Sequence, residues 1–189
     1  MLVDFIIPTY NRPAPLRAML ASLVAQTNGN WVANVVIDGK DYLNDTLDII
    51  EEIDDPRITY TVTDKRYNDW GHTPREMGKQ MSTAKYIIMT GDDNYYTPNF
   101  VQEISVLCNV EVGMIYWDMV HSHYNYAYFK CVPAGGQIDM GAFATRRDLA
   151  QQIYLGTEYA ADGWFVEQFK QKFPLENISK INKVLFVHN

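Results

Sequence analysis

The sequence predicts an α/β protein built on a central mixed, mostly parallel β-sheet that is flanked by helices. Over the first half of the 189-residue chain, short apolar runs alternate with stretches whose apolar residues recur at helical spacing. Four of the apolar runs end at polar residues, namely Thr9, Asp38, Asp64 and Asp92. Because helices between strands give parallel, right-handed crossovers, we expect these four ends to meet at one edge of the sheet.

The composition is that of a globular protein. The chain is 47% hydrophobic and 21% charged, which suffices for a sizeable core. It has no repeat, low-complexity tract or Pro/Gly-rich linker, so we expect residues 1–189 to form a single domain, which could be excised from a longer protein. A formal net charge of -7 without clustered Lys and Arg argues against a nucleic-acid surface.

Cysteines and apolar segments bear on the cellular compartment. Cys108 and Cys131 lack C-x-x-C spacing, which argues against a disulfide framework and a thiolate zinc site. The apolar start, Leu2–Ile7, is too short for a secretory signal, and no apolar run approaches the length of a membrane span. We therefore expect a cytoplasmic protein without a membrane span.

The first elements in chain order are three strands separated by two helices. Leu2–Pro8 is a predicted buried strand, and apolar residues at helical spacing over Leu16–Val24 predict the helix that follows. Trp31–Ile37 is the second predicted strand, and Leu43–Ile53 carries the helical period again. Arg57–Thr63, rich in β-branched residues, is the third strand.

Next comes a helix with a clear start. In Thr73-Pro74-Arg75-Glu76, Thr73 is the predicted cap, Pro occupies the first helical position, and Glu stands three residues after the cap. Tyr86–Thr90 is the fourth strand. The second half of the chain predicts further strands and helices, which extend a mixed sheet. They are strands at Gly113–Asp118, Tyr124–Val132 and Lys183–Val187 and helices at Arg146–Tyr154 and Asp162–Phe173.

Paired carboxylates directly follow the fourth strand. Asp92 and Asp93 repel each other and resist desolvation, so a strand end holds them at a cost unless a cation or a cluster of donors compensates. A divalent metal ion that carries a phosphorylated ligand would compensate the negative charges of both carboxylates. The alternative is a turn with an Asp cap, because Thr97-Pro98 downstream could open a helix.

Four motifs in order resemble the GT-A fold of family 2 glycosyltransferases, a Rossmann-like nucleotide-diphospho-sugar transferase fold. They are Ile6-Ile7-Pro8-Thr9-Tyr10-Asn11-Arg12, Val35-Val36-Ile37-Asp38-Gly39-Lys40-Asp41, Arg75, and Gly91-Asp92-Asp93-Asn94. The resemblance spans most of the chain. It implies a nucleotide-binding half over residues 1–98 and a half for the donor sugar and the acceptor over residues 99–189.

The resemblance also implies roles for residues of the first half. The loop with Thr9, Tyr10 and Arg12 would bind the nucleobase end of the donor, with Tyr10 stacked on a uracil-like ring. Asp38 and Asp41 match the acidic loop that contacts the nucleoside. The alternative for Tyr10 is that it covers the start of the following helix.

For the diphosphate, the resemblance implies one cation and one arginine. Asp93 would hold Mn²⁺ or Mg²⁺, Asp92 would reach the ribose or the sugar, and a hard cation fits either carboxylate. Arg75 would add a bidentate contact to the diphosphate. Its alternative is a surface ion pair with Glu76 or Asp69. His188 after the last strand matches a late metal ligand of some GT-A enzymes.

Residues of the second half resemble the chemistry-bearing segments of inverting members. Asp162 in Ala161-Asp162-Gly163-Trp164 would be the general base, and Trp164 could stack on an acceptor sugar. Asp139 in Asp139-Met140-Gly141-Ala142 would line the donor sugar. The alternatives are a helix cap for Asp162 and a loop turn for Asp139.

Together these expectations describe a metal-dependent glycosyltransferase. It would move a sugar from a nucleoside diphosphate, UDP in the first place, to a glycan or other hydroxyl acceptor, with inversion. Two alternatives stay open. One is a sugar-phosphate nucleotidyltransferase, although Pro8–Arg12 lacks the Gly-rich basic loop typical of that class. The other is a non-catalytic sugar-nucleotide binding module.

Overall fold

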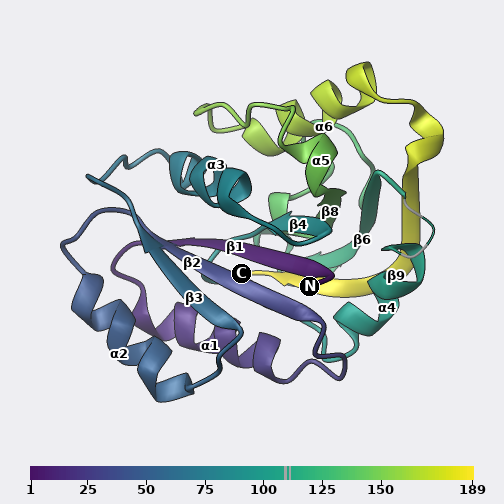
Figure 1. Cartoon of the computed structure of the whole chain (residues 1–189). Helices are drawn as coiled ribbons and strands as arrows, with labels where there is room; N and C mark the ends of the chain where they lie inside the picture. Colours follow the sequence, from purple (N-terminus) through teal and green to yellow (C-terminus); the bar gives the residue numbers. More distant parts are fainter. Residues whose placement is uncertain (109, 111) are drawn as a thin grey trace.

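A computed structural model describes residues 1–108, 110 and 112–189 (Figure 1). Its strands are β1 (Val3–Thr9), β2 (Trp31–Ile37), β3 (Ile58–Val62), β4 (Tyr86–Met89), β5 (Tyr95–Tyr96), β6 (Met114–His121), β7 (Ala127–Phe129), β8 (Phe143–Arg146) and β9 (Ile178–His188). Its helices are α1 (Pro13–Val24), α2 (Leu43–Ile53), α3 (His72–Met81), α4 (Phe100–Cys108), α5 (Arg147–Ala150) and α6 (Ala161–Lys172). Short 3-10 turns lie at Ser122–Tyr124, Met140–Ala142 and Leu175–Asn177.

The strands form one mixed sheet in the order β3-β2-β1-β4-β8-β6-β9-β5, with β7 paired to β6. The pairs β3-β2, β2-β1 and β1-β4 are parallel, as expected from the helices between them. Antiparallel pairing starts at β8, and β9 returns to run parallel to β6. The register sets Thr9 opposite Ile37 and Ile37 opposite Val62, so the loops after β1, β2 and β3 leave the sheet side by side.

Helices cover both faces of the sheet. Figure 1 shows α1, α2 and α4 below the sheet and α3, α5 and α6 above it. Every residue of β1 is buried because β1 lies between these two layers. Below it, Phe5 packs edge-on against Trp31 and Phe100 contacts Trp117, which continues the core from the first half of the chain into the second. The mixed sheet flanked by helices that the sequence predicts is confirmed.

The start of α3 differs from the prediction. Thr73 is not the cap, because the helix begins at His72 after Gly71, whose backbone is left-handed with φ 79°. The Asp69 carboxylate takes the role expected of Thr73 and accepts hydrogen bonds from the Thr73 amide and hydroxyl. A Cβ on Gly71 would also lie 2.7 Å from the Pro8 ring, so the turn packs closely on the end of β1.

Elements of the second half depart further from their predicted bounds. The helix expected over Arg146–Tyr154 is reduced to α5, because β8 runs through Arg146 and pairs with β4. The strand expected over Tyr124–Val132 is reduced to β7. The last strand, β9, is longer than expected and lies inside the sheet between β6 and β5. Among the described residues, no helix has the length and apolar character needed to cross a membrane.

A buried carboxyl at the opposite end of β1 gives a first prediction. Asp4 is 6% exposed, and burial raises its pKa from 3.8 to about 6, which the neighbouring Ser82 side chain only partly offsets. The folded state therefore holds this proton more tightly than the unfolded chain does. The contribution of Asp4 to the free energy of unfolding is therefore most favourable below pH 3.8 and becomes less favourable as the pH rises from 3.8 to about 6. Above about pH 6, the contribution of Asp4 to the free energy of unfolding is about 3 kcal/mol less favourable than it is below pH 3.8.

We expect Asp4→Asn to raise the free energy of unfolding by about 1–3 kcal/mol at pH 8 and to leave it nearly unchanged at pH 4. Urea unfolding at both pH values measures this. The control is Asp48→Asn on the exposed face of α2, which should change neither value. An Asp4→Asn protein that is no more stable at pH 8 than the parent would contradict the argument.

Candidate active site

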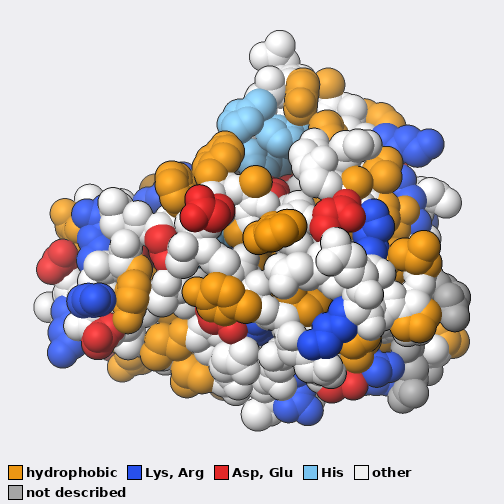
Figure 2. Space-filling view, turned by 90° about the horizontal axis from the view of Figure 1, so that it is seen from above, with side chains coloured by type: hydrophobic (Ala, Val, Ile, Leu, Met, Phe, Trp, Pro, Cys, Tyr) orange, Lys and Arg blue, Asp and Glu red, His pale blue; other side chains and the backbone are white. Residues whose placement is uncertain are grey.

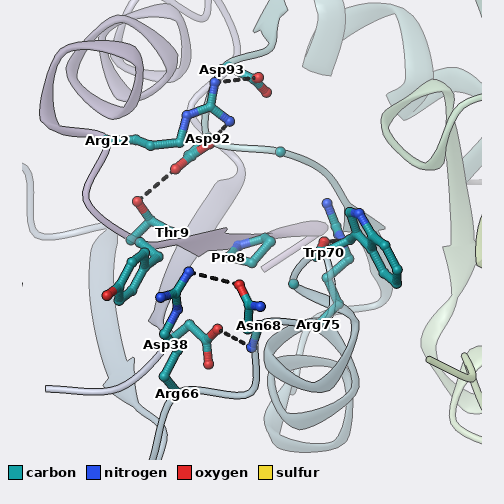
Figure 3. Close-up of a pocket in the computed structure, with 13 residues that line it drawn as sticks. Pro8, Thr9, Arg12, Asp38, Arg66, Asn68, Trp70, Arg75, Asp92 and Asp93 are labelled. Atoms are coloured by element: carbon teal, nitrogen blue, oxygen red, sulfur yellow. Dashed lines mark hydrogen bonds and ion pairs between the residues drawn. The ribbon is translucent and has the colours of Figure 1, made fainter. Parts of the chain in front are cut away.

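Two adjoining pockets open where the chain leaves the carboxyl ends of the strands. The first pocket is lined by residues at or just after the ends of four strands and by one residue of α3 (Figure 3). They are Pro8 and Thr9 at the end of β1, Tyr10 and Arg12 after it, Asp38 after β2, Arg66, Asn68, Trp70 and Gly71 after β3, Gly91–Asp93 after β4, and Arg75 of α3. The second pocket is lined by residues between 119 and 129, between 136 and 140 and between 159 and 162, by His188, and by Trp70, His72 and Arg75. Trp70 and Arg75 thus line both pockets.

The negative charges of Asp92 and Asp93 are compensated by donors from the end of β1 and from the loop that follows it. Because β1 and β4 are parallel neighbours, the Thr9 hydroxyl donates to Asp92 Oδ2 at 2.7 Å. The Arg12 guanidinium reaches both acids, with Nη1 3.2 Å from Asp92 Oδ1 and Nη2 2.7 Å from Asp93 Oδ2 (Figure 3). Burial raises the pKa of Asp92 to about 6, and the hydroxyl and the guanidinium oppose this rise.

A helix cap does not explain these acids. The next helix, α4, begins only at Phe100, and the bonds described for both carboxylates go to Thr9 and Arg12. The Asp93 side chain is 20% exposed at the pocket wall, and its carboxylate is the kind of hard oxygen donor that Mg²⁺ and Mn²⁺ prefer. Among the described residues, no three His, Cys, Asp or Glu side chains are arranged as a complete metal site.

Asp38 organises the loop after β3. Its carboxylate accepts hydrogen bonds from the backbone amides of Tyr67 at 2.8 Å and Asn68 at 3.0 Å. These bonds turn Arg66 and Asn68 toward the first pocket, where Arg66 Nη2 donates to Asn68 Oδ1 at 2.7 Å (Figure 3). Asp38 therefore both lines the pocket and fixes a loop that lines it.

Tyr10 lies under the same loop. The Arg66 guanidinium is 3.7 Å from the centre of the Tyr10 ring, and Tyr42 meets the ring edge-on at 5.0 Å. Asp41 is exposed outside the pocket lining, where it accepts from the Tyr10 hydroxyl at 3.4 Å. The structure thus brings Thr9, Tyr10, Arg12 and Asp38 to one pocket and leaves Asp41 at its border.

Arg75 holds the junction between the pockets. Its Nε donates to the Thr90 carbonyl at 3.0 Å and its Nη1 to the Trp70 carbonyl at 2.8 Å. The surface ion pair that the sequence left open is not formed, because Glu76 pairs with Lys79 and Asp69 binds Thr73. Burial lowers the pKa of Arg75. The negative charges of four nearby carboxylates partly offset this lowering, namely Asp139, Asp92, Asp93 and Asp162. One cation is therefore set among four carboxylates.

Asp162 lies in the second pocket, in the first turn of α6. Its carboxylate accepts from the Gly163 amide at 2.6 Å, and burial raises its pKa. The start of α6 packs closely against the backbone of Gly135, since a Cβ on Gly163 would lie 2.6 Å from Gly135 Cα. The alternative of a helix cap is wrong, because the cap position of α6 is Ala160 and carries no side-chain cap, so Asp162 is an acid of the first turn that lines the pocket.

Asp139 and His188 face each other in the second pocket. Asp139 accepts from the Gly141 amide at 2.7 Å and its Oδ2 is 3.7 Å from His188 Nε2. The His188 ring stacks on His121 at 4.0 Å and meets His123 at 5.4 Å, which makes the group of histidines visible in Figure 2. His188 and Asp93, both expected to bind metal, line different pockets.

The family model for glycosyl transferase family 2 matches residues 4–105, which run from β1 into α4. The chain belongs to glycosyl transferase family 2. The match contains Arg75 and the three carboxylates of the first pocket, whereas Asp139, Asp162 and His188 lie beyond it. The family predicted from the four motifs is thereby confirmed.

Individual proteins are also similar to this family 2 domain. WcaA of Escherichia coli (strain K12), named for glycosyl transfer in colanic acid biosynthesis, is 28% identical over 98 residues, which are 52% of this chain and 34% of WcaA. The crystal structure of S. aureus TarS 1–349 superimposes with a TM-score of 0.81 at 17% identity, over 100% of this chain and 60% of TarS 1–349. The chain therefore spans about one third of WcaA and 60% of the TarS fragment.

Two further solved structures contain ligands of their own. TarS 1–349 in complex with UDP gives a TM-score of 0.76 at 16% identity, over 99% of this chain and 60% of that one. The mannosyltransferase PcManGT from Pyrobaculum calidifontis, in complex with GDP-Man and Mn²⁺, gives 0.72 at 17% identity, over 98% of this chain and 56% of that one. These similarities confirm the predicted GT-A fold.

Three pocket residues of this family 2 domain escaped the sequence analysis. Arg66, Asn68 and Trp70 follow β3, whose carboxyl end lies at the same edge as those of β1 and β2. The rule that gathers strand ends at one edge did include this loop, but through Asp64, which lines neither pocket. Its side-chain directions depend on the Asp38 carboxylate and on left-handed backbone at Asn68 and Trp70, which no local pattern indicates.

Proposed function

We propose that the protein transfers a sugar from a nucleoside diphosphate sugar, with UDP as the nucleotide, to a hydroxyl acceptor. The observation that carries this proposal is the junction of the two pockets at Arg75. One side of the junction holds the Asp92–Asp93 pair, and the other holds Asp162. A donor that crosses the junction would put its diphosphate beside the cationic groups and its anomeric carbon toward the second pocket.

The first pocket suits a nucleoside diphosphate. Tyr10 and Arg66 provide flat surfaces for a base, and the Asn68 amide and the Asp38 carboxylate provide hydrogen-bonding groups for the base and ribose. Arg75 provides the cation next to the diphosphate. Complexes of TarS with UDP and with UDP-GlcNAc, which share the fold, support this placement.

Asp93 would hold a divalent cation at the pocket wall, with Asp92 behind it. Such a cation, when bound, neutralises negative charge that develops on the departing diphosphate. Asp92 is buried against Thr9 and Arg12, so its role is to orient this corner and to reach the ribose or sugar. The GDP-Man and Mn²⁺ complex of PcManGT supports metal use on this fold.

The second pocket would receive the acceptor. In a single displacement, the acceptor oxygen attacks the anomeric carbon while the bond to the diphosphate breaks on the opposite face, so the configuration inverts. The acceptor proton passes to a carboxylate oxygen of Asp162, whose pKa burial has raised toward that of an effective base. Asp139 and His188 would line the donor sugar between the two groups.

Thermal unfolding with nucleotides tests the proposal. We expect UDP with Mn²⁺ to raise Tm by roughly 5–10 °C at a hundredfold excess over its dissociation constant, because a ligand that binds only the folded state stabilises it. UDP without Mn²⁺, and CDP or GDP with it, should give smaller shifts. A panel without any nucleotide-dependent shift would overturn the proposal. Diphosphate release from UTP and a sugar phosphate would favour a nucleotidyltransferase instead.

A further inference from the structure

We propose that Trp70 and Tyr159 form an aromatic clamp that binds a carbohydrate acceptor. The inference rests on the proposed function and names the substrate class of the second pocket. Both side chains are large and exposed, Trp70 at 64% and Tyr159 at 74%, and both line that pocket. Their rings meet edge-on, with centroids 5.8 Å apart and planes at 74°.

Trp70 is held in place at a cost in backbone energy. Its φ is 56°, in the left-handed region that is unfavourable for a residue other than glycine. Arg75 fixes its carbonyl at 2.8 Å, and Gly71 follows it with φ 79°. A strained backbone that presents an exposed indole gains nothing for the core, so the strain points to a ligand. Figure 3 shows the indole beside Arg75, where the two pockets join.

Tyr159 comes from the other side of the pocket, three positions before Asp162. The segment that carries it is anchored to α3, the helix that begins next to Trp70. Lys79 of α3 is fully buried and donates to the Ile153 carbonyl, and its partner Glu76 accepts from the Leu155 amide at 3.0 Å. One helix therefore sets the spacing of both rings.

The residues that line the second pocket suit a sugar ring. The C–H faces of a pyranose pack on flat aromatic rings, while its hydroxyls need acceptors and donors around the rim. Here the rings are Trp70 and Tyr159, and the carboxylates of Asp139 and Asp162 lie in the same pocket. A pyranose on the clamp would be beside the candidate base, Asp162, so one of its hydroxyls can be the nucleophile.

Tryptophan fluorescence can test the clamp without measuring transfer. Of the four tryptophans, Trp31 and Trp117 are fully buried, while Trp70 and Trp164 are exposed. In a Trp164→Phe background, Trp70 is the one exposed indole that remains. We expect methyl glycosides of glucose, galactose, mannose or N-acetylglucosamine, added with UDP and Mn²⁺, to give a saturable blue shift of emission.

Substitutions of single aromatic residues show which side chains give rise to the fluorescence response. Tyr159→Ala should weaken the glycoside response roughly tenfold, as loss of one stacked ring predicts. Tyr60→Ala removes a tyrosine of β3 that is 49% exposed and lies outside both pockets, and it should change nothing. In the same Trp164→Phe background, Trp70→Phe leaves only the buried Trp31 and Trp117, so it should abolish the shift, and a shift that persists there would overturn the clamp.

The two proposals fail in different ways. If UDP with Mn²⁺ stabilises the protein but no glycoside in the panel changes the fluorescence, the carbohydrate clamp is wrong and the proposed donor site stands. If no nucleotide stabilises the protein, the proposed function itself is wrong. A glycoside response that Tyr159→Ala leaves at full affinity would also contradict the clamp.

Discussion

Replacing Asp93 by asparagine is expected to reduce sugar transfer about 10³-fold, the scale on which preorganised charge stabilisation contributes to catalysis. Asparagine keeps the shape of the side chain but removes the charge that would hold a divalent cation. The same change leaves Arg12 without one of its two carboxylate partners, 2.7 Å away in the parent. The substitution therefore removes the candidate metal ligand and also changes the carboxylate pair that Arg12 bridges.

Steady-state kinetics at varied Mn²⁺ concentration measures this loss, and thermal unfolding supplies the second readout. We expect the additional Tm shift that Mn²⁺ gives to UDP to disappear in Asp93→Asn, because the cation no longer binds. Asp48→Asn is the matched control, since it makes the same change on the exposed face of α2. Full transfer with unchanged metal dependence would show that Asp93 has been assigned wrongly.

Asp162→Asn is expected to lower kcat by about 10²–10⁴-fold, the usual contribution of a general base. The donor KM and the Tm shift with UDP should stay near those of the parent, because Asp162 lines the second pocket and not the first. Asparagine can still accept from the Gly163 amide, so the start of α6 should be preserved. A loss confined to kcat would identify Asp162 as a base, whereas a carboxylate that only shapes the start of α6 would affect stability instead.

The pH profile gives a further test of Asp162. A base acts in its ionised form, so activity should rise with pH through the pKa of Asp162, which burial raises above that of an ordinary Asp. Asp162→Asn should remove this acid limb. Asp45→Asn, which alters an acid in the first turn of α2, is the matched control. If Asp162→Asn leaves transfer unchanged, the base lies elsewhere. Nucleotide binding without transfer in the parent would identify a non-catalytic binding module.

The parallel half of the fold was predictable because its information is local. β1 and β4 are buried along their whole length and β2 along most of it, so they appear as largely apolar runs, whereas the more exposed β3 is marked by its β-branched residues. The helices α1 and α2 carry a helical period between these strands. Parallel crossovers then gather the strand ends at one edge, so the convergence of Thr9, Asp38 and Asp92 followed from the order of elements.

The antiparallel half was harder to predict from the sequence because its strands are defined by pairing with distant partners. β8 has four residues and is fixed by pairing with β4 and β6. β9 starts five residues earlier than expected because β6, whose paired residues lie 64 to 67 positions earlier, supplies a ladder along most of its length. Such pairing leaves no period in the local sequence, and strand propensity depends on context.

The sequence by itself determined the α/β class, the order of the first strands and helices, and the acids that end β2 and β4, since each depends on side-chain periodicity and on topology rules. Tertiary structure alone decided that Arg12 pairs with Asp92 and Asp93, that Asp38 shapes the loop after β3, and that Trp70 meets Tyr159. The reason is physical: these contacts join residues tens of positions apart, and only the packed sheet sets their distances.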